Sequence, residues 1–125
     1  MSALSDARAH LRKAREFLDA AHLSLDGDLY NAATSSAVTS GINAKDAICL
    51  ALTGKTAKSE NHTDAVGELR AAGPATKSLA TTLGRLLKLK SKSQYQMLDV
   101  VRADAVKAVG WATTLVEGAT GIVAK

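Results

Sequence analysis

The chain has 125 residues, the size of one ordinary domain, so we predict a single domain over residues 1–125. Hydrophobic residues make up 46%, enough for one core, and the formal net charge is only +4. The single cysteine excludes an internal disulfide or a cysteine zinc site, and four aromatic residues are too few for a base-stacking platform. Because 24 residues are alanine, the strongest helix former, we predict an all-α protein.

We expect a cytoplasmic location without membrane association. One unpaired cysteine fits a reducing compartment. The N-terminus lacks the basic region and apolar run of a signal peptide. The longest uncharged stretch, residues 29–44, is rich in Ser, Thr and Asn and shorter than a membrane span of ~20 apolar residues.

A first helix is predicted up to Gly27, with Ser2 or Ser5 as its N-terminal cap. Its apolar residues recur at steps of three and four, which places them on one helical stripe. These residues are Leu4, Ala7, Leu11, Ala14, Leu18, Ala21 and Leu25.

A second helix is predicted over residues 29–53, capped by Asp28 and ended by Gly54. The middle of its inner stripe consists of small residues, which allow another helix to approach closely. That neighbour belongs either to the same chain or to a second copy. The small residues are Ala33, Ala37, Gly41 and Ala44.

The rest of the chain predicts three further helices. A polar loop over residues 54–61 precedes a short helix over 63–72, and Pro74 is suited to open the next one, over 75–90. A polar linker over 91–98 leads to the last helix, over 103–123. The sequence therefore predicts an up-and-down bundle of four long helices and one short helix.

Basic residues are concentrated in one tract of the chain. Between Arg70 and Leu98 there are six basic residues and no acidic one. Such a surface suits phosphate groups or an acidic protein, or is simply solvated. His62 lies where the polar loop meets the short helix, close in sequence to Lys58, and free backbone N–H groups there favour an anion. We find no paired inner carboxylates, Ser-His-Asp spacing or His-x-x-x-His pair, so the sequence predicts neither a metal nor a cofactor.

Several segments together resemble HEPN domains (higher eukaryotes and prokaryotes nucleotide-binding). The resemblance implies an all-α bundle of about five helices, commonly a homodimer, with a nucleotide or RNA ligand and a nucleotidyltransferase-type protein partner. Many HEPN proteins are ribonuclease toxins, and others are non-catalytic binding partners. The segments are residues 17–21 and 26–33 with the acidic-Gly turn and Tyr30, residues 44–47, His62, residues 86–90 leading to Tyr95, and residues 105–116.

HEPN ribonucleases carry Arg-x(4–6)-His late in the bundle, where Arg holds the phosphate and His moves a proton. Here residues 88–96 contain no histidine. We therefore predict a non-catalytic nucleotide-, RNA- or partner-binding module of a toxin–antitoxin or nucleotidyltransferase-linked system. The candidate ligand- or phosphate-binding residues are Lys58, His62, Arg85, Lys88, Lys90, Lys92 and Tyr95.

Two alternatives stay open. The first is a divergent ribonuclease that cleaves RNA without a metal and whose residues come from two parts of the chain. The second is a purely structural bundle that dimerises. The residues of the first alternative are Arg15, His22 or His62 with Lys90 and Tyr95.

Overall fold

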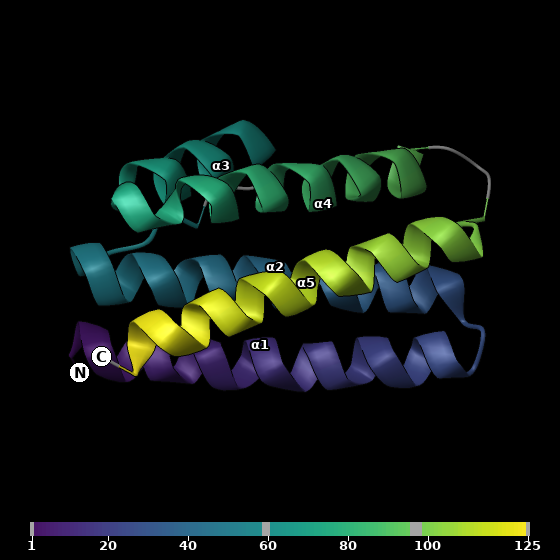
Figure 1. Ribbon diagram of the computed structural model, residues 1–125, viewed down its shortest axis with the longest axis horizontal. Helices are drawn as coiled ribbons and strands as arrows, with labels where there is room; N and C mark the ends of the chain where they lie inside the picture. The colour runs from purple at the N-terminus through teal and green to yellow at the C-terminus, as the bar shows by residue number, and fades with distance from the viewer. Residues whose placement is uncertain (1, 59–60, 96–98, 125) are drawn as a thin grey trace.

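The computed structural model describes residues 2–58, 61–95 and 99–124, and of residues 62 and 91–95 it describes the backbone alone. This part of the chain is an all-α bundle, as predicted (Figure 1). None of its helices is long and apolar enough to cross a membrane. The elements are α1 (Ala3–Asp26), α2 (Tyr30–Thr53), α3 (His62–Ala71), a 3-10 turn (Pro74–Thr76), α4 (Lys77–Tyr95) and α5 (Arg102–Val123).

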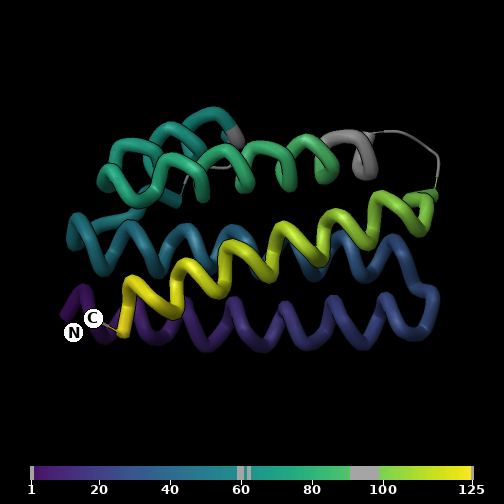
Figure 2. Tube along the Cα trace, in the orientation of Figure 1, coloured from purple at the N-terminus to yellow at the C-terminus, as the bar shows by residue number. Residues whose placement is uncertain are grey.

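The helices form two layers. α1, α2 and α5 contact one another, and α4 packs against α2 and α5. α3 and α4 form a second hairpin on the upper side of this layer in Figure 2. In the described part of the chain α1 contacts neither α3 nor α4, so α1 and the α3–α4 hairpin lie on opposite sides of the bundle (Figure 1).

Most predicted helix ends are confirmed, but one cap is wrong. The Ser2 hydroxyl accepts a hydrogen bond from the Ser5 N–H at 3.1 Å, and Gly54 ends α2 at φ 78°, a conformation that favours glycine. Asp28 does not cap α2, because Leu29 holds that position and no side chain bonds there. Asp28 instead takes the left-handed turn itself, at φ 60°, a conformation that aspartate tolerates better than most residues.

The fourth helix differs from its predicted range at both ends. Pro74 opens a 3-10 turn and α4 begins only at Lys77. The buried Thr76 hydroxyl joins this turn to α3 through the Leu69 carbonyl oxygen, 2.6 Å away. Residues 91–95, predicted as a linker, continue α4 to Tyr95. This segment contains neither Gly nor Pro, so its polar character alone did not end the helix.

The small-residue stripe of α2 is a contact within the chain. Ala33, Ala37, Gly41 and Ala44 are all buried. A Cβ atom at Gly41 would lie 2.6 Å from Leu86 Cδ2 of α4 and 3.2 Å from Leu115 Cδ1 of α5. The stripe therefore brings α4 and α5 close to α2, and it is not free to form a dimer interface.

Candidate functional site

A buried charged cluster lies where α2, α3 and the segment between them meet. Lys45 and Asp46, the only charged residues of α2, are both buried. The Lys45 ammonium pairs with the Glu68 carboxylate of α3 and donates hydrogen bonds to Asp46 Oδ1 at 3.2 Å and to Thr56 Oγ1 at 3.0 Å. We call Lys45, Asp46, Thr56 and Glu68 the Lys45 cluster.

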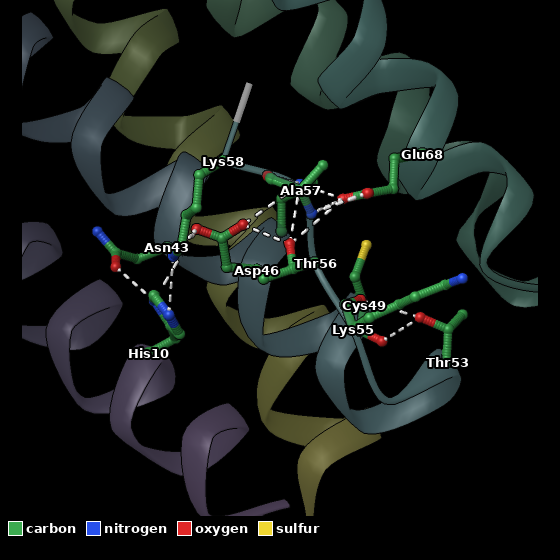
Figure 3. A network of polar contacts seen from close by, with 11 residues as sticks. His10, Asn43, Asp46, Cys49, Thr53, Lys55, Thr56, Ala57, Lys58 and Glu68 are labelled. Atoms are coloured by element: carbon green, nitrogen blue, oxygen red, sulfur yellow. Dashed lines mark hydrogen bonds and ion pairs between the residues drawn. The ribbon is translucent and has the colours of Figure 1, made fainter. Parts of the chain in front are cut away.

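The Lys45 cluster holds residues 56–57, which follow α2, and part of this arrangement is drawn in Figure 3. The Thr56 hydroxyl donates to Asp46 Oδ1 at 2.6 Å. The Ala57 N–H donates to Glu68 Oε2 at 2.9 Å, and the Ala57 carbonyl oxygen accepts from Lys45 Nζ at 3.2 Å. Because every charge has an oppositely charged or hydrogen-bonding neighbour, the cluster meets the condition for keeping ionised groups inside a protein.

The electrostatics of the cluster favour its charged form. Burial by itself lowers the pKa of Lys45, but the hydrogen bond to Glu68 and the charge of Asp46 outweigh it and raise the pKa. Burial acts to raise the pKa of Glu68, yet the hydrogen bonds from Lys45 and from the Ala57 N–H lower it overall. Burial raises the pKa of the nearby Cys49 thiol to about 12, so this cysteine is protonated at neutral pH and is not a nucleophile.

These shifts predict a loss of stability in acid. The folded pKa of Glu68 lies below that of an unfolded glutamate, about 4.3, so its contribution is complete above that pH and falls as the pH drops through the folded value. Because the pKa of Lys45 is raised, its charged form stabilises the fold fully below about pH 10.4, and this contribution to stability is lost only in stronger alkali. Urea midpoints of the wild type and of Glu68→Gln should therefore converge below about pH 4. A constant difference down to pH 3 would contradict this prediction.

A basic groove lies between α3 and α4 and has a volume of about 530 Å³. Arg70 of α3 and Arg85 and Lys88 of α4 are exposed around it, and among the residues that the structure describes no acidic side chain lines it. Between the cations the lining is largely apolar, with Val66 half-buried and Leu87 buried. We call this the α3–α4 groove. Its lining residues are Thr63, Val66, Arg70, Ala80, Thr81, Gly84, Arg85, Leu87 and Lys88.

The candidate residues named from the sequence do not all lie in the α3–α4 groove. Arg85 and Lys88 share the α3–α4 groove, joined there by Arg70, which the sequence marked only as the start of the basic tract. Lys58 lies elsewhere, with its Nζ 3.3 Å from Asp46 Oδ2. Lys90 is half-buried on α4, outside the groove lining. The side chains of His62, Lys92 and Tyr95 fall outside the described residues.

The residues of the alternative ribonuclease site are spread over the bundle. Arg15 and His22 are exposed on α1, and Arg15 Nη2 donates to Thr120 Oγ1 of α5 at 3.1 Å. Lys90 is on α4, which α1 does not contact in the described residues. The fold therefore does not bring Arg15 and His22 beside Lys90.

Sequence reasoning missed the Lys45 cluster, although a signal was present. Lys45 and Asp46 are the only charged residues in the predicted second helix, and apolar residues flank them on both sides. Charges on the inner face of a helix are rarely buried without partners. The partners Thr56 and Glu68, however, follow in a loop and in another helix, and spacing does not predict their approach.

Comparison with known proteins identifies the family. Residues 7–121 match the HEPN domain, which covers nearly the whole chain. A search of curated proteins finds no significant match. The bundle of four long helices and one short helix agrees with the fold that the resemblance implied. The chain belongs to the HEPN domain family.

Proposed function

We propose that the protein is a non-catalytic binding module that holds a phosphate-bearing ligand, a nucleotide or a segment of RNA, in the α3–α4 groove. The observation that carries the proposal is the placement of Arg70, Arg85 and Lys88 around one groove whose described lining residues include no acidic side chain. Membership of the HEPN family supports a role related to nucleotides or RNA.

The shape of the groove supports this ligand class. Three cations from two helices surround a largely apolar surface, so phosphate oxygens can meet the charged rim while a sugar or base covers the half-buried Val66. The guanidinium groups of Arg70 and Arg85 can each donate two parallel hydrogen bonds to a phosphate. Binding of this kind depends strongly on salt, because phosphate contacts release condensed counterions.

Binding without cleavage is supported by the positions of the histidines. The last histidine of the sequence is His62, so none follows the basic residues of α4 where HEPN ribonucleases carry theirs. We extend the proposal to assembly: the protein works with a nucleotidyltransferase-type partner and as a homodimer. Since the small-residue stripe of α2 is buried within the chain, the dimer has to use another surface.

The proposal is tested by titrating labelled single-stranded RNA and a labelled nucleoside triphosphate with the protein, followed by fluorescence anisotropy. We expect Arg85→Ala with Lys88→Ala to weaken binding about tenfold, which corresponds to about 1.4 kcal/mol. For RNA, the slope of log affinity against log salt should fall by about 0.7 for each phosphate contact that is lost.

The matched control is Arg12→Ala with Lys13→Ala, which removes the same charge from exposed positions on α1. This variant should bind within about twofold of the wild type, because α1 contacts neither helix of the groove in the described residues and salt screens charges that do not touch the ligand. An equal loss of affinity in the two double variants would show that the probes bind through the net charge of the protein alone. No binding by the wild type of either probe would refute the proposal.

A further inference from the structure

His10 of α1 contacts both the second helix and the segment that leads to α3. Its Nδ1 atom lies 2.9 Å from Asn43 Oδ1, and its Nε2 atom lies 3.1 Å from Lys58 Nζ (Figure 3). The ring is largely buried, with 18% of the side chain exposed. Lys58 also reaches Asp46 Oδ2 at 3.3 Å, so its ammonium lies between the imidazole and the carboxylate.

These contacts fix the tautomer of His10. The Asn43 Nδ2 group donates to the Thr39 carbonyl oxygen at 3.0 Å, so Asn43 Oδ1 is the atom turned toward the ring and can only accept. His10 Nδ1 therefore carries a hydrogen. The Lys58 ammonium has no acceptor capacity and can only donate, so Nε2 has to present its lone pair. His10 is thus neutral while it accepts the hydrogen bond from Lys58.

We propose that His10 and Lys58 form a pH-sensitive latch on the segment between α2 and α3. A proton taken from solvent by His10 Nε2 removes the acceptor and places a cation 3.1 Å from the Lys58 ammonium. Lys58, 65% exposed, then turns into solvent and keeps its own three hydrogens. The imidazolium, whose Nδ1 is 3.9 Å from Asp46 Oδ2, replaces Lys58 as the counter-charge of that carboxylate.

The charged surroundings support this exchange. Asp46 is buried and has Lys58 on one side and Lys45 on the other, so losing Lys58 still leaves it one cation. Lys45 in turn is paired with Glu68 of α3. The ion pair between Lys45 and Glu68 does not involve the imidazole, so a proton on His10 Nε2 acts first on the contact with Lys58.

Other charges face His10 less directly. Within the described residues the other helix packed on α1 is α5, and Thr120 of α5 receives the hydrogen bond from Arg15. α5 runs opposite to α1 (Figure 1), and the charged residue of α5 within one turn of Thr120 is Glu117. On α1 itself the charged residues one turn away are Asp6 and Lys13.

The latch is tested by NMR on the full ¹⁵N-labelled chain. At pH 7.5 the two-bond ¹H–¹⁵N correlations of His10 should show a hydrogen on Nδ1 and none on Nε2. As the pH is lowered, Nε2 should also gain a hydrogen, and the Lys58 amide shift should follow with the same midpoint. Protection of the amides of residues 55–58 against hydrogen exchange should fall about three- to tenfold, the range of one ordinary hydrogen bond.

His22 provides the control, since it is exposed on the same helix and its titration should leave Lys58 unmoved. His10→Gln should abolish the pH response of Lys58 and of residues 55–58. An Nε2-protonated tautomer at pH 7.5 would overturn the latch. A Lys58 amide shift that does not change with pH at the midpoint of His10 would overturn it as well. The tautomer of His10 and the amide shift of Lys58 are both measured on the wild-type protein, so these two tests remain valid even if His10→Gln fails to fold.

Discussion

Lys45→Met is expected to lower the free energy of unfolding by about 3 kcal/mol, the lower end of the cost of breaking a buried ion pair. Methionine fills most of the space of the lysine stem but supplies no charge. Asp46 and Glu68 both contact the Thr56 hydroxyl, so without the ammonium two carboxylates face each other across one oxygen atom. Glu68 still accepts the hydrogen bond from the Ala57 N–H, and 29% of its side chain is exposed to water. Both features limit the loss of stability.

Urea unfolding followed by circular dichroism measures this loss through the midpoint and the slope. Lys107→Met, at an exposed position of α5, is the matched control and should change stability by less than about 0.5 kcal/mol. In a double-mutant cycle, Glu68→Gln should recover at least about 1 kcal/mol of the loss in Lys45→Met, because residues in direct contact are coupled. A Lys45→Met protein as stable as the wild type would contradict the role given to the cluster.

Gly41→Ala is expected to destabilise the protein by about 2 kcal/mol. Alanine gains about 1 kcal/mol in helix propensity over glycine. The new Cβ atom, however, would lie 2.6 Å from Leu86 Cδ2 and 3.2 Å from Leu115 Cδ1, and both leucines are fully buried. Overpacking of this kind costs about 1 to 3 kcal/mol, and we take the upper end, about 3 kcal/mol, because two buried side chains have to move. The strain therefore exceeds the gain.

Gly110→Ala is the matched control because it is also inside a helix, α5, but a Cβ atom there meets nothing within 4 Å. This variant should gain up to about 1 kcal/mol from helix propensity and reduced freedom of the unfolded chain. The two variants should thus shift the urea midpoint in opposite directions. A stabilised Gly41→Ala protein would show that α4 and α5 do not approach α2 as closely as the structure has them.

The fold was largely predictable because its signals are local. The stripe of α1 and the glycine after α2 act within a few residues. The structure confirms the glycine, and it confirms the stripe except for Leu4, which is 43% exposed at the start of the helix. The errors occurred where local signals were weak or misleading. Polar residues after Lys90 suggested a linker but do not break a helix, and Asp28 had the chemistry of a cap but adopts the turn conformation instead.

The site was predictable only in part. The basic tract placed Arg85 and Lys88 one turn apart on one helix, and their common position follows from helical spacing. Arg70 joins them only because α3 folds back on α4. Lys58 belonged to the same candidate set by charge, yet the structure places it against Asp46 and His10. Helical spacing therefore explains the contacts along α4, whereas the contacts between elements depend on the packing.

The sequence by itself determined the helical class, the number of helices and the small-residue face of α2, because helix propensity and periodicity act over a few residues. Only the tertiary structure decided what that face contacts: Gly41 meets Leu86 and Leu115 of the same chain. It also decided that Lys45 pairs with Glu68, which lies 23 positions further along the chain. The physical reason is that a buried charge is tolerated only beside its partners, and those partners come together only when separate helices pack.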